Sequence, residues 1–195
     1  GILDGTSPAS FSKGGRSNRW LEVYGNNNYT GATTIKAGYL RITNDSPQSF
    51  LNNTTFTGPG HLQIRPNSTN FSSVLSMSDI NFTGTSINEL YLGRSGTNTK
   101  LVLDEDISTG NEIHIYMPVE VNGGDRSITA TNDNIRFYQT INSDTSARTL
   151  TLDSGNGNVR IDGAVGNSAP LNNINIIAEA LTAGAITLNG ALTAT

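Results

Sequence analysis

The chain has 195 residues and a formal net charge of −4, with 14% charged residues, 35% hydrophobic residues and no cysteine. The acidic balance excludes a general affinity for nucleic acid or an anionic membrane surface, because neither would find a basic patch to dock on. The lack of cysteine excludes a disulfide framework and a thiolate metal site.

Small polar residues dominate the composition. Asn, Thr, Ser and Gly supply 88 of the 195 residues, and they separate short runs of Val, Ile, Leu and Thr. This pattern is typical of an all-β chain with many tight corners. The most apolar segment, 174–188, is interrupted by Glu179 and Thr182, so we expect no membrane insertion of this segment: a spanning helix needs about 20 apolar residues.

The first elements form a strand–turn–strand unit. We expect residues 1–19 to be an N-terminal cap or lead-in, and two alternating strands at 20–24 and 33–42 to flank a Gly- and Asn-rich turn at 25–31. Gly38 interrupts the second strand, and Gly25, Gly31 and Gly38 permit positive φ at corners or a close approach of a neighbouring coil. The chain begins without Met and ends within a pattern, so we expect a fragment of a longer protein.

An apolar–x–apolar triplet then recurs along the chain, as expected for strands with one buried face. The first series has a mean interval of about 24 residues. Its members are Leu40-x-Ile42, Leu62-x-Ile64, Leu90-x-Leu92, Ile113-x-Ile115, Ile135-x-Phe137, Val159-x-Ile161 and Ile186-x-Leu188. A second series lies between them and consists of Leu51, Leu75, Leu101-x-Leu103, Ile128-x-Ala130, Leu150-x-Leu152 and Ile174-x-Ile176.

Two interleaved series with one period favour a solenoid. We predict a right-handed parallel β-helix of about seven coils, with roughly 24 residues per coil, over residues 20–195 as a single domain. The inward residues of each series would form the core. An antiparallel β-sandwich is the alternative, because it also offers short strands at regular spacing.

The segment at 11–43 resembles the passenger-associated repeat of bacterial autotransporters. The matching residues are Lys13, Gly14, Leu21, Val23, Gly25, Asn26, Asn28, Tyr29, Thr30, Gly31, Thr33, Thr34, Ile35, Gly38, Leu40 and Ile42. The segments at 150–166 and 170–176 are more loosely similar to filamentous-haemagglutinin-like surface proteins. The resemblance implies a β-helix that is extracellular, on the cell surface of a Gram-negative bacterium, and it transfers no catalytic residue.

Few residues point to chemistry. Asp104, Glu105 and Asp106 directly follow a predicted strand and are a weak candidate for a calcium site, since calcium prefers oxygen ligands; a solvated turn is the alternative. His114 lies between two inward isoleucines and should point outward. We find no arrangement typical of catalysis and expect no cofactor.

The outward positions of the first series should lie one above another. They are Arg41, Gln63, Tyr91, His114, Arg136, Arg160 and Thr187, and two positions further on come Thr43, Arg65, Gly93, Tyr116, Tyr138, Asp162 and Asn189. The candidate binding residues on this face are Tyr91, His114, Tyr116, Arg136, Tyr138 and Arg160. Aromatic rings and guanidinium groups suit sugars, carboxylates or a protein partner, although simple cross-coil stacking would also explain them.

These observations predict a non-catalytic function, as an adhesin passenger or structural stalk whose partner is a host or neighbouring-cell glycan or protein. The alternative is a self-assembling extracellular filament subunit that associates end to end through unpaired strand edges. A polysaccharide lyase or hydrolase is a third possibility, which would require clustered acids and bases on one exposed sheet.

Overall fold

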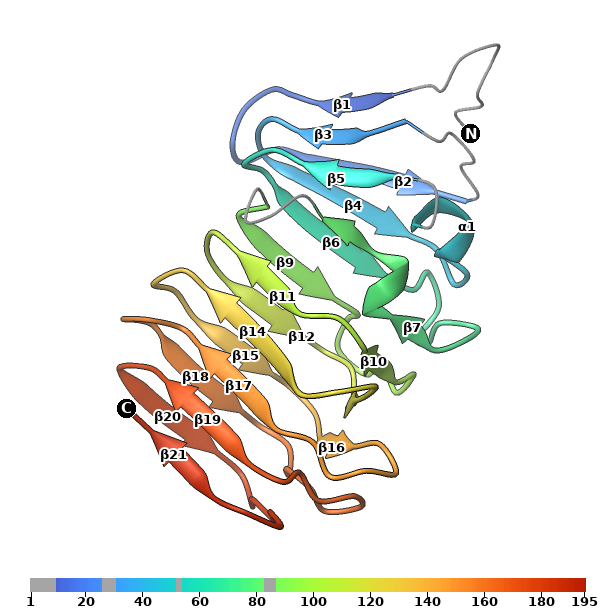
Figure 1. Cartoon of the computed structure of the whole chain (residues 1–195). Coiled ribbons are helices and arrows are strands. Elements are labelled where there is room, and N and C mark those ends of the chain that lie inside the picture. Colours follow the sequence, from blue (N-terminus) through green and yellow to red (C-terminus); the bar gives the residue numbers. More distant parts are fainter. Residues whose placement is uncertain (1–9, 26–30, 52–53, 83–86) are drawn as a thin grey trace.

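The computed structural model describes residues 10–25, 31–51, 54–82 and 87–195, and it is an all-β parallel solenoid (Figure 1). The chain makes about eight turns spaced by about 22 residues, against the about seven coils of roughly 24 residues expected from the sequence. Every strand pairing runs parallel, which excludes the antiparallel sandwich.

The longest sheet has eight strands, one from each turn. In spatial order they are β2 (Trp20–Tyr24), β4 (Tyr39–Thr43), β6 (His61–Arg65), β9 (Glu89–Leu92), β12 (Ile113–Ile115), β15 (Ile135–Phe137), β18 (Asn158–Ile161) and β20 (Ala180–Ala183). The first strand, β2, accounts for the extra turn, because the triplet series starts one turn later, at Leu40.

Two further sheets hold the strands that immediately precede those of the eight-stranded sheet. One contains β1 (Phe11–Lys13), β3 (Thr33–Ile35), β5 (Thr55–Thr57) and β8 (Asn81–Phe82). The other contains β11 (Ile107–Thr109), β14 (Arg126–Ala130), β17 (Leu150–Asp153), β19 (Ile174–Ile177) and β21 (Leu192–Ala194). Because β1 pairs with β3, the segment expected to be a cap or lead-in already contributes a strand to the solenoid.

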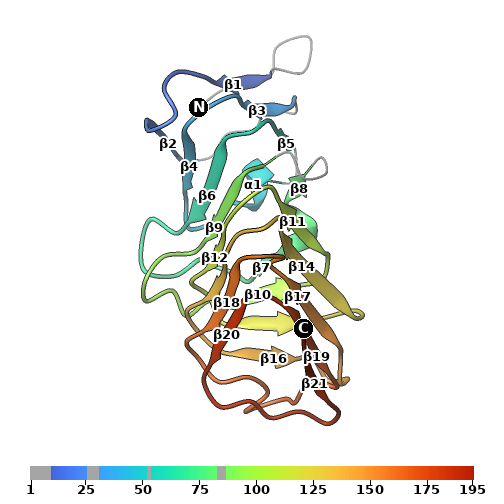
Figure 2. The same ribbon diagram turned by 90° about the vertical axis from the view of Figure 1, so that its left-hand side faces the viewer.

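A fourth sheet holds the short strands that follow the eight-stranded sheet: β7 (Leu75–Ser76), β10 (Leu101–Leu103), β13 (Val119–Val121) and β16 (Ile141–Ser143). The turns from β6 to β17 therefore have three strands each, and Figure 2 shows the sheets on different sides of the solenoid. The short helix α1 (Gln48–Leu51) occupies the place of the third strand in an early turn, and the 3₁₀ helix η1 (Met77–Asp79) follows β7. No helix in the described part of the chain is both long and apolar enough to cross a membrane.

The core consists of inward-pointing ladders. Leu40, Leu62 and Leu90 pair in register in successive turns, and all three are fully buried. Ile113, Ile135 and Val159 continue the same ladder and are equally buried. Full burial of such a side chain contributes about 1.5–3 kcal/mol, so the repeated triplet is the main source of stability.

Gly38 confirms the predicted need for glycine at a corner. Its φ is +70°, and a Cβ placed on it would lie 2.5 Å from the backbone oxygen of Arg19. Gly25 also has a positive φ, of +74°. The neighbouring turn residues Asn26, Asn28, Tyr29 and Thr30, which contribute to the family resemblance, lie outside the described residues.

The prediction is wrong for the last triplet of the first series, because Ile186-x-Leu188 does not lie in the eight-stranded sheet. Val159 pairs with Leu181 of β20, whereas Ile186 forms a bridge with Val165 beside the short-strand sheet. The last inward pair of the long sheet is therefore Leu181 and Ala183. Since Ala183 is small, this strand carries a weaker apolar signal than the Ile186-x-Leu188 triplet that follows it.

The second triplet series combines two sheets. Leu75 and Leu101 lie in the short-strand sheet, whereas Ile128, Leu150 and Ile174 lie in the five-stranded sheet. Period alone does not separate strands that recur at the same interval on two sides of one turn. In the turns from β6 to β17, the structure therefore adds a third strand to the two that the sequence predicted.

Candidate functional site

The outer face of the eight-stranded sheet carries three columns of side chains. In the middle column, Glu22, Arg41, Gln63, Tyr91, His114, Arg136, Arg160 and Thr182 pair in register. The order predicted from Arg41 to Arg160 is confirmed, and Thr182 replaces Thr187 at the end. Tyr116, Tyr138 and Asp162 follow the strands two positions further on, so all six predicted binding residues lie on one face.

Most aromatic rings on this face stack on one another. Tyr91 and His114 have centroids 4.7 Å apart and planes 7° apart, and Tyr116 and Tyr138 have centroids 4.0 Å apart and planes 10° apart. The guanidinium carbon of Arg136 lies 4.2 Å from the ring centroid of Tyr138. Parallel strands about 4.8 Å apart bring equivalent side chains to stacking distance, so rings at equivalent positions of successive turns stack.

A chain of hydrogen bonds connects these rings. The Tyr116 hydroxyl donates to the Tyr138 hydroxyl at 3.3 Å, and the Tyr138 oxygen lies 3.0 Å from His114 Nδ1. His114 Nε2 lies 3.0 Å from Glu112 Oε2. Because a carboxylate only accepts, Nε2 carries the hydrogen, and in the neutral ring Nδ1 accepts from Tyr138.

The pKa of Glu112 and those of the Tyr91 and Tyr116 phenols are shifted by their surroundings. Burial raises the pKa of Glu112, but the hydrogen bonds from His114 and Asn134 outweigh it, so the net pKa is lowered. Burial raises the pKa of Tyr91 and of Tyr116, and their hydrogen bonds to Glu89 and Tyr138 raise it further. Glu112 is thus a carboxylate at neutral pH, and both phenols keep their protons.

Two arginines share one carboxylate at the edge of the face. Arg136 donates to Asp162 Oδ2 through Nη2 at 2.9 Å, and Arg160 donates to Asp162 Oδ1 through Nε at 2.5 Å. The hydrogen bonds from Arg160 and Arg136 lower the pKa of Asp162 despite partial burial. The pair of guanidinium groups therefore retains one surplus positive charge.

A hollow of about 260 Å³ lies between β12, β15 and β18. It is lined by Glu112, His114, Asn134, Ile135, Arg136, Asn158 and Arg160. The Arg136 guanidinium leans over Tyr138 and toward Asp162, and neither of these two residues lines the hollow. The hollow brings together three of the six predicted residues, His114, Arg136 and Arg160.

A second stack lies at the beginning of the same face. Trp20 stacks on Tyr39 at 4.1 Å, Tyr39 stacks on His61 at 4.2 Å, and the Arg41 guanidinium carbon lies 4.1 Å from the Trp20 ring. His61 Nδ1 lies 3.1 Å from a Glu89 carboxylate oxygen, an ion-pair distance, although the orientation gives no hydrogen bond.

The binding residues predicted from the sequence do not include this second stack. They lie inside an apolar triplet or directly after it, whereas Trp20, Tyr39 and His61 stand immediately before the triplets. The signal was available in the sequence, because an aromatic or imidazole side chain stands at this position in three successive turns.

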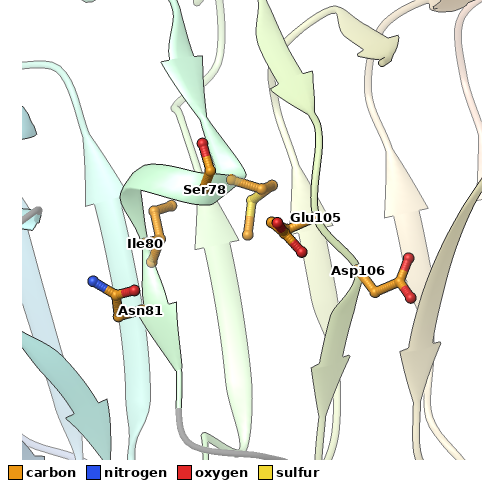
Figure 3. A pocket seen from close by; sticks show the side chains of 6 residues that line it. Ser78, Ile80, Asn81, Glu105 and Asp106 are labelled. Carbon is orange, nitrogen blue, oxygen red and sulfur yellow. The ribbon is translucent and has the colours of Figure 1, made fainter. Parts of the chain in front are cut away.

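Two residues of the acidic run, Glu105 and Asp106, line a separate pocket together with Met77, Ser78, Ile80 and Asn81 (Figure 3), whereas Asp104 does not line it. The Asp104 carboxylate accepts hydrogen bonds from the hydroxyls of Ser76 and Ser78, and Asp106 accepts one from the Ser127 backbone N–H. Within the described ranges, no group of three His, Cys, Asp or Glu residues is arranged to hold a metal ion. The three carboxylates therefore do not converge on one site.

Comparisons with known proteins do not assign the site: no family model matches the sequence, and no curated protein or solved structure is significantly similar to it.

Proposed function

We propose that this chain is part of an extracellular bacterial surface protein, in which it acts as an adhesin passenger or structural stalk and does not catalyse a reaction. The observation that carries the proposal is the outer face of the eight-stranded sheet, where rings, guanidinium groups and amides form one continuous surface. Planar polar and aromatic side chains of this kind suit a glycan or a protein partner.

The hydrogen bonding on this face supports binding over catalysis. Tyr138 accepts from Tyr116 and donates to His114, while both oxygens of Glu112 accept hydrogen bonds, from His114 and Asn134. A catalytic acid or base needs a pKa matched to its task and a free path to the substrate. Here the protons are engaged within the cluster, which favours a rigid recognition surface.

The proposed surface location rests on the resemblance of residues 11–43 to the passenger-associated repeat of autotransporters, and on the composition of the chain. A chain rich in Asn, Thr, Ser and Gly with little charge is compatible with a solenoid stalk, and the β-solenoid fold provides one. On such a stalk, the outer face of the eight-stranded sheet would be displayed along the side of the rod.

The test is binding of the purified chain to glycan and surface-protein arrays. We expect binding that is lost in the triple variant Tyr116→Ser/Arg136→Gln/Tyr138→Ser. The control is Arg126→Gln/Thr129→Ser/Thr151→Ser, which alters the five-stranded sheet and should leave binding unchanged. Circular dichroism of both variants checks that the solenoid persists. Binding that survives the first triple variant would show that this face is not the site.

The enzyme alternative is tested with the same proteins. Incubation with acidic and neutral polysaccharides, followed by measurement of new reducing ends and of unsaturated products, should show no turnover. Turnover that disappears in the triple variant would replace the binding proposal with a lyase or hydrolase.

End-to-end association into a filament is the second proposal. In this chain, β20 and β21 each pair with one strand among the described residues, and Leu192 in β21 is 47% exposed. Open strand edges template further pairing. Analytical ultracentrifugation should then show oligomers that grow with concentration, whereas a monomer at every concentration would oppose this proposal.

A further inference from the structure

The hollow between β12, β15 and β18 differs from the rest of the face because Arg136 turns away from its register partner His114. The Arg136 side chain leans toward Tyr138 and Asp162 instead of lying beneath His114. Asn134 and Asn158 form one wall, with Asn158 Nδ2 donating to Asn134 Oδ1 at 3.2 Å. The result is a depression lined by His114, Asn134, Asn158, Arg136 and Arg160, together with Glu112 and Ile135.

Several donors at this hollow remain available. The hydrogen bonds of Arg136 use its Nε and Nη2, and the hydrogen bond of Arg160 uses its Nε. Arg136 Nη1 and both Nη groups of Arg160 therefore have no partner in the described ranges. The Arg160 side chain is 53% exposed, so its fork is accessible from solvent.

The surplus positive charge of Arg136 and Arg160 favours an anionic ligand group at their end of the hollow. Arg136 and Arg160 together face the single carboxylate of Asp162. The other carboxylate at the hollow, Glu112, accepts hydrogen bonds from His114 and Asn134 at the opposite end. A guanidinium fork matches a carboxylate in geometry. Two guanidinium groups that share one protein carboxylate can therefore donate hydrogen bonds to a second carboxylate, from a ligand.

The size and the remaining walls of the hollow favour a sugar over a simple anion. A volume of about 260 Å³ exceeds the need of one carboxylate or phosphate. The amides of Asn134 and Asn158 offer both donors and acceptors, which suit neighbouring hydroxyls. The imidazole of His114 adds a planar wall beside which a sugar ring can lie.

We propose that this hollow binds a hexuronate residue of an acidic glycan. Its carboxylate lies against Arg136 and Arg160, its ring beside His114, and its hydroxyls near Asn134 and Asn158. This inference rests on the proposed function, because it names the ligand class for the same face, and it adds Asn134 and Asn158 to the binding residues.

The test is isothermal titration calorimetry with tetragalacturonate and with its methyl ester, which has the same rings without the charges. Tetragalacturonate should bind, and its ester should bind at least about tenfold more weakly. Arg160→Gln should weaken tetragalacturonate binding by about tenfold or more because it removes the accessible fork. Arg126→Gln, with the same charge change on the five-stranded sheet, should bind as the wild type does.

Equal binding of the acid and the ester, an unchanged affinity in Arg160→Gln, or no heat with tetragalacturonate would each overturn the inference. If arrays then showed an uncharged glycan or a protein partner whose binding requires Tyr116, Arg136 and Tyr138, the proposed function would stand without it. If the arrays showed no ligand and tetragalacturonate did not bind, both would fail.

Discussion

Tyr138 lies flat against Tyr116 from the preceding turn, with ring centroids 4.0 Å apart and planes 10° apart. Their hydroxyls also share a hydrogen bond, and Tyr138 continues the chain to His114. The pair joins two successive turns outside the core. Its rings cover each other, so a ligand on this face meets mainly ring edges, hydroxyls and the groups around the hollow.

The Tyr116–Tyr138 contact should contribute measurable coupling to stability. In a double-mutant cycle with Tyr116→Ala and Tyr138→Ala, we expect a coupling energy of about 0.5–1.5 kcal/mol, because stacked aromatic pairs contribute beyond their buried area. Urea unfolding of the four proteins measures it. A cycle with Tyr39→Ala and Tyr138→Ala, which stand several strands apart, should give almost none. Additivity of the first pair would contradict the stacking energy.

Inward ladder residues should be far more sensitive than outward ones. Ile113 is fully buried, and Ile113→Ala should lower the free energy of unfolding by about 2–5 kcal/mol through lost burial and a cavity. Thr129, which points outward in β14, serves as the control. Thr129→Ala should change the free energy of unfolding by less than about 0.5 kcal/mol. Similar losses in both variants would refute the assignment of faces.

Two glycines near the start of the solenoid should respond in opposite ways to alanine. Gly38 has a φ of +70° and no room for a Cβ, so Gly38→Ala should destabilise the protein by more than about 1 kcal/mol. Gly14 has nothing within 4 Å of a built Cβ, and Gly14→Ala should be neutral or slightly stabilising. Thermal unfolding compares them; equal shifts would count against the close approach at Gly38.

Glu112 should make the free energy of unfolding fall as the pH is lowered. Its pKa is lowered in the folded protein from an ordinary value of 4.5, so its contribution is present above pH 4.5 and is lost as pH falls through the folded-state pKa. Wild-type protein should therefore lose more stability on acidification below pH 4.5 than Glu112→Gln, which has no carboxyl to protonate. Denaturant unfolding at several pH values tests this, and parallel pH profiles would contradict it.

Much of the fold was predictable because its core repeats. Each turn places two apolar residues, such as Leu62 and Ile64, on the inner side of one strand, and this alternation is visible without the structure. The third strand, in the turns that have one, is harder to recognise in the sequence. Its inward residues, such as Val119 and Ile141, recur at the same interval as those of the other two strands of a turn. The last strand of the eight-stranded sheet, β20, was not predicted, because Ala183 stands where earlier turns have a larger apolar residue.

The site was predictable in position and less so in detail. Register alone placed Tyr91, His114, Arg136 and Arg160 in one column. The hollow was not predictable, because it accompanies the way the Arg136 side chain leans toward Asp162 and Tyr138. That choice depends on charge and stacking between neighbouring turns, which a sequence period does not encode.

The most direct measurement is side-chain footprinting of the purified chain with a ligand found on the arrays. Oxidative labelling, read by mass spectrometry with and without that ligand, reports which side chains become covered. We predict reduced labelling at Tyr91, His114, Tyr116 and Tyr138, with the other sheets unchanged. Protection confined to the side chains of the other three sheets would contradict the assignment of binding to the outer face of the eight-stranded sheet.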